Sequence, residues 1–104
     1  MCGRYFIDVD DMEIQEILAA LGHDARIKTG EIFPSNVVPV LTVERKPQLM
    51  QWGYTRFDGK GKVINARSET VTEKPMFQKS MREKRCLIPA SHYFEWKDTG
   101  AAKN

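Results

Sequence analysis

The strongest structural signal in this chain is the stretch VVPVLTVERKPQLMQWGY, residues 37–54. It contains two runs of β-favouring residues, VVPVLTV (37–43) and QLMQWGY (48–54), which the short polar segment ERKP separates. Runs of this kind, bounded by polar residues and proline, are typical of paired strands. The stretch therefore predicts a β-hairpin that turns near Lys46. Because proline has no N–H to donate, Pro39 predicts an edge strand or a bulge.

Upstream of this hairpin the sequence predicts a strand followed by a helix. GRYFID (3–8) is expected to form the strand. Asp10 and Glu13 then have the spacing of a capping box, with Asp in place of the usual Ser or Thr. One apolar helical face follows and ends at Gly22, and it is formed by Ile14, Ile17, Leu18 and Leu21. Residues 23–36 are expected to form a polar connection.

Downstream of the hairpin the sequence predicts shorter elements. The turn DGKG (58–61) leads into KVINARSET (62–70), and residues 73–84 are expected to form a short helix. CLIPA (86–90) and HYFEWK (92–97) are expected to be strands. The solvent-facing side of the short helix would carry Lys79, Arg82 and Lys84. The whole pattern predicts an α+β fold.

Length and composition predict one soluble domain. A chain of 104 residues with 41% hydrophobic and 29% charged residues can form a single core of modest size. No apolar run is long enough to cross a membrane, and the first residues lack the pattern of a signal peptide. We therefore expect a cytoplasmic protein, or a nuclear one in a eukaryote. Two cysteines make no disulfide framework, and Cys86 is expected to be a small buried hydrophobe.

The charge is distributed unevenly along the chain. Residues 1–24 contain six acidic side chains and only one basic side chain, Arg4, although the net charge of the chain is +2. Residues 25–104 are correspondingly basic. A basic body suits a polyanion such as a nucleic acid, because phosphates are bound by clustered Lys and Arg. An ordinary solvated surface explains the same charge, so this signal is weak by itself.

Cys2 follows the initiator methionine directly, and this position has chemical consequences. A cytosolic methionine aminopeptidase usually removes Met1 when the next residue is as small as cysteine. The mature chain would then begin with an α-amine of pKa about 7.7–8.0 beside a thiol of pKa about 8.5, both partly deprotonated near neutral pH. Such an aminothiol condenses with an aldehyde to an imine, and the thiolate closes a thiazolidine ring. Position 2 alone proves little, because any residue can stand there.

Polar residues in the middle of the chain add a second candidate cluster. Asn65, Arg67 and Glu69 stand at alternate positions, so they share one face if the stretch is extended. Arg67 can bind a phosphate in bidentate fashion, and Asn65 can orient a hydroxyl or an oxyanion. The alternative is a surface ion pair between Arg67 and Glu69, with Asn65 in a turn.

A carboxyl group and two tryptophans complete the set of candidates. Glu95 stands between Phe94 and Trp96, an apolar setting that favours the neutral carboxyl and would let it carry protons. An ordinary exposed residue on an alternating strand is the alternative. Trp52 and Trp96 are either core residues or, in a basic cleft, stacking platforms for bases. Two histidines and two distant cysteines lack metal-ligand spacing, so we expect no metal and no other cofactor.

Three separated motifs together carry a family resemblance. MCGR (1–4), INARSET (64–70) and RCLIPASHYFEW (85–96) occur in the order found in the SOS-response-associated peptidase (SRAP) family, which this chain closely resembles. Its animal members are known as embryonic-stem-cell-specific 5-hydroxymethylcytosine-binding proteins. The resemblance implies one SRAP domain over residues 1–104, with a β-barrel-like core, flanking helices and a positively charged cleft. Because the family domain is about twice this length, we expect only its N-terminal half here.

The resemblance also implies a chemistry and the residues that perform it. Family members cross-link abasic sites in DNA, joining the ring-opened sugar aldehyde to an N-terminal cysteine as a thiazolidine. Cys2 matches this nucleophile, Asn65 the asparagine beside the adduct and Glu95 the catalytic glutamate. The family also uses a histidine downstream of the EW motif, beyond the last residue of this sequence. Neither His23 nor His92 stands in its place.

The expected partner is single-stranded DNA that contains abasic sites. The resemblance assigns DNA contacts to Trp52 and Arg67, and it places Arg4 near the phosphates of the lesion. The turn-like end DTGAAKN suggests a missing strand, which a second chain would supply if the sequence is complete. Two other functions stay open, a cysteine-type peptidase or autopeptidase, as the family name suggests, and a module that binds DNA without chemistry. In a bacterium the protein would be associated with the nucleoid.

Overall fold

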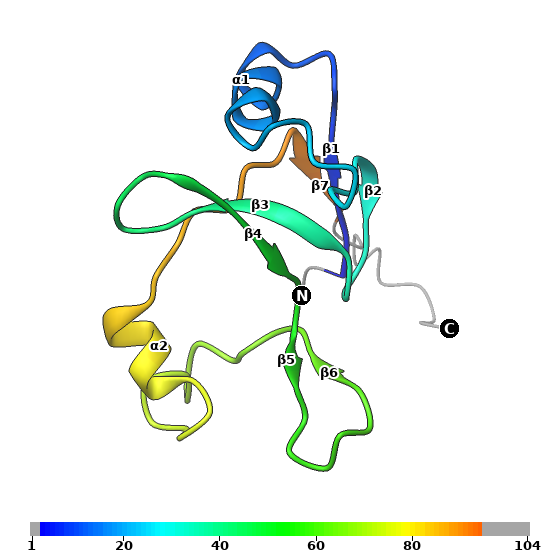
Figure 1. The fold of residues 1–104 in the computed structure, drawn as a ribbon. Coiled ribbons are helices and arrows are strands. Elements are labelled where there is room, and N and C mark those ends of the chain that lie inside the picture. The colour runs from blue at the N-terminus through cyan, green and yellow to red at the C-terminus, as the bar shows by residue number, and fades with distance from the viewer. Residues whose placement is uncertain (1–2, 95–104) are drawn as a thin grey trace, which may run out of the picture.

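The computed structural model describes residues 3–94, which form an α+β fold of short elements (Figure 1). In chain order these elements are β1 (Tyr5–Ile7), α1 (Met12–Ala20), β2 (Gly30–Ile32), β3 (Val37–Leu41), β4 (Pro47–Gln51), β5 (Tyr54–Thr55), β6 (Lys62–Val63), α2 (Gln78–Glu83) and β7 (His92–Tyr93). The strands form three antiparallel sheets, ordered β2–β1–β7, β3–β4 and β5–β6. Figure 1 shows the β3–β4 hairpin between the first sheet with α1 and the β5–β6 hairpin with α2. The predicted α+β class is confirmed.

The β3–β4 hairpin matches the prediction from residues 37–54. Its register pairs Val37 with Gln51 and Leu41 with Pro47. The connection turns at Arg45, whose backbone is left-handed with a φ of 58°, one residue before the predicted position. Local sequence therefore determines this part of the fold.

Pro39 lies on the outer edge of the hairpin, as an edge proline should. Leu41 exchanges two backbone hydrogen bonds with Leu87, of 2.9 and 2.8 Å, on the side away from β4. On the same side, the Val37 carbonyl accepts a bond from the Lys28 N–H at 2.9 Å. Because backbone groups of alternate residues point to the same side of a strand, the backbone nitrogen of Pro39 also points away from β4, although its side chain is buried. Its missing N–H therefore removes no bond between the two strands.

The β2–β1–β7 sheet contains a strand that the sequence did not predict. Tyr5 in β1 lies opposite Ile32 in β2 and Tyr93 in β7. Residues 23–36 are thus not a polar connection throughout, because β2 occupies 30–32. The predicted first strand is also shorter than expected, at Tyr5–Ile7 instead of 3–8.

Helix α1 begins one residue later than the sequence predicts. Asp11, and not Asp10, is the N-cap, and its side chain accepts the Glu13 N–H at 3.0 Å. Ile14 is buried, as the apolar face predicts. The helix ends before Gly22, which adopts a φ of 70° that glycine tolerates at a helix end.

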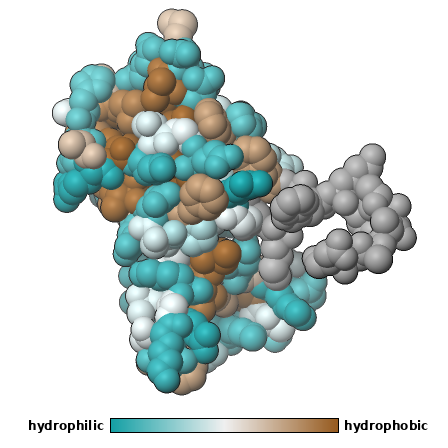
Figure 2. All heavy atoms as spheres, turned by 90° about the vertical axis from the view of Figure 1, so that its right-hand side faces the viewer, coloured by the Kyte–Doolittle hydropathy of each residue, from teal (hydrophilic) through white to brown (hydrophobic). Residues whose placement is uncertain are grey.

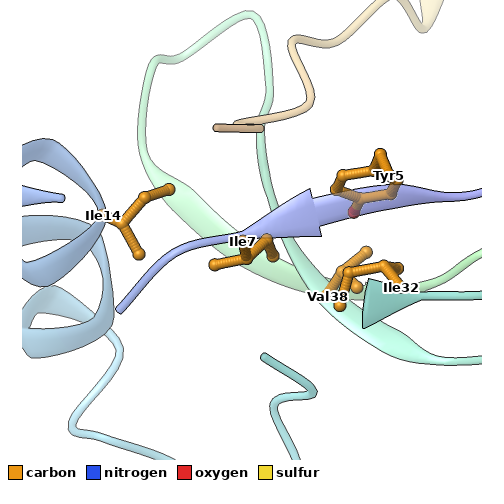
Figure 3. Packing of buried hydrophobic residues seen from close by; sticks show 5 residues of the cluster. All are labelled: Tyr5, Ile7, Ile14, Ile32 and Val38. Carbon is orange, nitrogen blue, oxygen red and sulfur yellow. The ribbon is translucent and has the colours of Figure 1, made fainter. Parts of the chain in front are cut away.

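The hydrophobic core joins α1, the first sheet and the β3–β4 hairpin. Figure 3 shows its buried residues, which are Tyr5, Ile7, Ile14, Ile32 and Val38. Ile7 and Ile32 are fully inaccessible to solvent. Leu18 and Trp52 are partly buried and pack against this cluster. Burial of each large apolar side chain stabilises the fold by about 1.5–3 kcal/mol, so each residue of this small cluster contributes substantially to stability.

The second half of the chain has less regular structure than predicted. In the stretch 62–70, which was expected to be extended, strand β6 ends at Val63. A turn closes at its far end, where the Thr70 N–H donates to the Arg67 carbonyl at 3.2 Å. Helix α2 begins at Gln78 instead of residue 73, and none of its residues is buried. The predicted strand 86–90 is reduced to a single bridge at Leu87.

The predicted barrel-like core is not confirmed. Within residues 3–94 the three sheets remain separate and do not close into a barrel. Large apolar side chains are instead open to solvent, including Leu87 and Tyr93, each 68% exposed. Figure 2 shows such apolar surface in both the upper and the lower part of the molecule.

Candidate functional site

Three clefts meet at Asn65, which is half-buried and lines all of them. We name them the apolar cleft (about 440 Å³), the helix cleft (about 350 Å³) and the basic cleft (about 430 Å³). Trp52 lines the first two, and Arg67 lines the third. The structure therefore brings three of the predicted site residues to one connected surface.

The apolar cleft lies between the β3–β4 hairpin and the segment that leads to β7. Val38 and Val40 of β3 line it together with Ile88 and Tyr93. Tyr93 belongs to β7, so residues far apart in sequence form this cleft. Its walls are largely hydrocarbon, which suits the face of a base or a sugar better than a phosphate.

The helix cleft lies between Trp52 and α2. Tyr54 and Phe77 both line it, and their ring centroids are 5.6 Å apart. Lys84 and Arg85, just after α2, line the same cleft. Aromatic rings beside cationic side chains are the combination that single-stranded nucleic acids bind, because the bases stack and the phosphates pair with the charges.

The basic cleft extends this surface beyond Asn65. It is lined by Arg67, which is exposed, and by Lys74. No Asp or Glu stands among the described residues that line the three clefts. The charged side chains that line these clefts in the described part of the chain are therefore all basic, a composition that favours polyanions.

Trp52 combines the two roles that the sequence left open. Its ring packs against Tyr5 of the core, with the centroids 5.6 Å apart and the planes inclined by 56°. The side chain is only half-buried and also lines two clefts. Trp52 is thus a core residue at one side and a cleft wall at the other.

Arg4 lies apart from the three clefts. Its guanidinium is 4.8 Å from the centre of the Phe94 ring and 3.8 Å from the Glu31 carboxylate. Tyr5 faces the core and the apolar cleft, and neighbouring residues of a strand point to opposite faces. Arg4 is not among the residues that line the clefts. Its expected contact with lesion phosphates stays a prediction.

Two predicted catalytic residues, Cys2 and Glu95, lie outside the described residues. Their distances to Asn65 therefore stay predictions. Glu69 was expected to share a face with Asn65 and Arg67, but residues 68–70 form a turn, and Glu69 lines none of the clefts. The premise of an extended stretch was wrong at this point.

Cys86 is not the buried hydrophobe that the sequence predicted. It is a free, exposed cysteine that lines the apolar and helix clefts. The reason is structural: only Leu87 of this segment pairs with β3, so the segment does not enter the core.

Sequence reasoning also missed several residues that line the clefts. Phe77, Lys74 and Arg85 were not among the predicted site residues, although all three line these clefts. A signal was present, since basic residues recur on both sides of Phe77 between 74 and 85. An aromatic residue with basic residues on both sides is a combination that nucleic-acid surfaces use.

Within residues 3–94 no group of His, Cys, Asp and Glu side chains has an arrangement that can hold a metal ion. In the same part of the chain neither helix is long and apolar enough to span a lipid bilayer.

Comparisons with a family model and with known proteins agree on one family. A family model described as "SOS response associated peptidase (SRAP)" matches residues 1–104. The chain is 36% identical to the abasic site processing protein YoqW of Bacillus subtilis, with 93% of this chain and 48% of YoqW covered. It is 35% identical to YobE of the same species, covering 93% and 49%, and 35% identical to YMR114C of Saccharomyces cerevisiae, covering 69% and 22%. The two Bacillus relatives are thus about twice as long as the matched region. No solved structure matches significantly.

Proposed function

Because this chain belongs to the SRAP family, we propose that its protein binds single-stranded DNA and captures abasic sites covalently through Cys2. One observation carries the proposal: Trp52, and Asn65 with Arg67 from the separate motif INARSET, line connected clefts with basic and aromatic walls. The names of the relatives, which are abasic site processing proteins, support the lesion as the target.

The proposed reaction uses the ring-opened sugar of an abasic site. After removal of Met1, the α-amine of Cys2 adds to the sugar aldehyde and loses water to give an imine. The Cys2 thiolate then forms a C–S bond to the imine carbon, and the imine nitrogen takes up a proton. The products are a thiazolidine and one water molecule, so no oxidant or reductant is needed. Glu95 would move the protons of the dehydration step.

The cleft residues would bind the DNA around this centre. Arg67 in the basic cleft would pair with a phosphate, which a guanidinium contacts in bidentate fashion. Asn65, where the three clefts meet, would hold a hydroxyl of the opened sugar. Trp52 would stack on a base beside the lesion, an interaction worth about 1–3 kcal/mol per base.

Cross-linking to DNA tests the proposal directly. Met1-processed protein is mixed with a single-stranded oligonucleotide that contains one abasic site, and the mixture is separated on a denaturing gel. We expect a shifted covalent band, which Cys2→Ala should abolish. Cys86→Ser is the matched control, because it removes the other thiol of the chain and should retain the band.

A second oligonucleotide separates binding from chemistry. A tetrahydrofuran residue mimics an abasic site but has no aldehyde, so it should bind without forming the band. If Cys2→Ala cross-links as well as the unmodified chain, the proposed nucleophile is wrong. If the protein binds both oligonucleotides equally and cross-links neither, the non-covalent binding module is the correct function.

A further inference from the structure

We propose that Asn36 is a positioning residue that fixes Trp52 in the wall between the apolar and helix clefts. This inference rests on the proposed function, because Trp52 is assigned there to base stacking. It concerns the turn FPSN, residues 33–36, which connects β2 to β3. Nothing in the chemistry of the cross-link requires this turn, and its role follows from its contacts.

The turn is closed by its own last residue. The Asn36 side-chain oxygen Oδ1 accepts the Phe33 N–H at 2.8 Å, and the Asn36 N–H donates to the Phe33 carbonyl at 3.1 Å. Ser35 between them has a left-handed backbone with a φ of 78°. A residue other than glycine is strained in that region by about 1–3 kcal/mol. The two bonds made by Asn36 therefore hold Ser35 in a conformation that it would not adopt in a free loop.

The strained turn holds the backbone of Trp52 on both sides. The Ser35 N–H donates to the Trp52 carbonyl at 2.9 Å, and the Trp52 N–H donates to the Asn36 carbonyl at 3.0 Å. Gln51 adds a brace, because its Nε2 donates to the Ser35 carbonyl at 3.0 Å. Trp52 stands after the last residue of β4, so these bonds extend the hairpin by one pair.

The chain cannot continue as a strand past Trp52. Gly53 has a φ of 106°, so the backbone changes direction there. Strand β4 therefore holds Trp52 through the residue that precedes it, and the turn 33–36 holds it through backbone hydrogen bonds. Gly53, which follows Trp52, does not continue the strand. Loss of the Asn36 side-chain acceptor would leave the backbone bond from residue 36 to Phe33 as the remaining closure of the turn. Ser35 would then relax more easily, and both backbone bonds to Trp52 would weaken.

The position of Trp52 matters because its ring is shared. The Trp52 side chain contacts the Tyr5 ring of the core, and it also lines the apolar and helix clefts. A ring that rotates away from Tyr5 would fill a cleft in place of a base. Asn36 would thus affect DNA binding without touching the DNA.

Fluorescence of Trp52 tests the positioning in the free protein. Trp96→Phe leaves Trp52 as the sole tryptophan of the chain. In that background we expect Asn36→Ala to increase acrylamide quenching and to lower the fluorescence anisotropy. Asn36→Asp retains an oxygen acceptor at the same place and should resemble the parent. Gln51→Ala removes the brace to Ser35 together with the 3.3 Å bond that Gln51 Oε1 accepts from Lys62 Nζ, and it leaves the Asn36 bonds in place. It should change quenching in the same direction but less.

Binding to a single-stranded oligonucleotide with a tetrahydrofuran site then tests the consequence. One net hydrogen bond corresponds to about fivefold in an equilibrium constant, so the population with Trp52 in place, and with it the affinity for DNA, should fall by up to about fivefold in Asn36→Ala. Asn36→Ser keeps an uncharged acceptor and should restore part of the affinity, because serine makes similar but weaker turn bonds. Unchanged quenching in Asn36→Ala, or equal quenching in the Ala and Asp variants, would overturn the role of Asn36. If the parent protein binds no DNA, the proposed function fails, while the quenching of the free protein still decides the positioning.

Discussion

Replacement of Gly53 by alanine should destabilise the folded chain strongly, and the reason lies in two features of this residue. Its φ of 106° lies outside the conformations that residues with a β-carbon adopt. A β-carbon built on Gly53 would also lie 3.1 Å from the Cβ of Lys62 in β6. Alanine would therefore strain the backbone and displace the β5–β6 hairpin at the same time.

Gly59 provides a matched control for the size of the effect. It also has a positive φ, of 71°, but a β-carbon there would have no neighbour within 4 Å. Its φ is close to the left-handed helical region, where a β-carbon costs about 1 kcal/mol. For Gly53→Ala we expect a loss of about 3 kcal/mol, from greater strain and the added contact. The difference between the two variants, about 2 kcal/mol, measures the special environment of Gly53.

Urea unfolding followed by circular dichroism provides the assay. With a denaturant dependence of about 1–3 kcal/mol per molar, the midpoint of Gly53→Ala should lie about 1 M below that of Gly59→Ala. Equal midpoints for the two variants would refute the reasoning, because they would show that the Lys62 contact and the unusual φ of Gly53 carry no extra cost.

Two further predictions concern the surface. Asp24 accepts hydrogen bonds from the Arg26 side chain and backbone, which lower its pKa from 3.8 to about 2. The stability that this pair contributes is therefore complete above pH 3.8 and is lost as the pH falls through about 2. Between pH 4 and pH 2 the free energy of unfolding, measured with urea, should decline less steeply for Asp24→Asn than for the unmodified chain. Equal slopes for the two proteins would contradict a stabilising Asp24–Arg26 pair. The exposed Cys86 thiol predicts that folded Cys2→Ala protein reacts with one equivalent of a chromogenic disulfide reagent. If the thiol reacts only after denaturant is added, Cys86 is buried, as expected from the sequence.

The hairpin and the first helix could be predicted because their signals are local. Two β-favouring runs separated by the polar segment ERKP specify 37–54, and a single apolar face specifies α1. Only the boundaries moved, as with the cap at Asp11 in place of Asp10. Neighbouring carboxylates offer equivalent caps, so sequence alone does not choose between them.

Strand β2 could not be predicted because its pairing is remote. Its three residues include Gly30, which has a φ of 77°, and no alternation of apolar and polar residues marks them. It is a strand because Ile32 lies opposite Tyr5, a partner distant in sequence. A short segment of low β-propensity becomes a strand only when another strand supplies its hydrogen bonds.

The sequence predicted several residues of the candidate site, but it did not predict how the chain brings them together with other residues in one surface. Asn65 and Arg67 were chosen for their chemistry, and both line the basic cleft, whereas the turn at 68–70 takes Glu69 away from it. The same turn, closed by the bond from Thr70 to Arg67, precedes Lys74, which lines the cleft with them. The prediction for Cys86 was wrong for a different reason. Its residue type predicted burial, but its segment pairs with β3 through a single bridge and leaves the thiol exposed.

The two prolines of the β3–β4 hairpin have a consequence for how the chain reaches its native pairing. The backbone nitrogen of Pro39 points away from β4, and Pro47 stands opposite Leu41, whose own backbone groups bond to Leu87. Sliding one strand past the other by a single residue would bring a proline nitrogen to a point where the ladder needs a donor. Misaligned hairpins of that kind would lose a bond at once and reopen. The prolines therefore favour the native register over pairings that are shifted by one residue, because only the native register leaves both proline nitrogens outside the ladder.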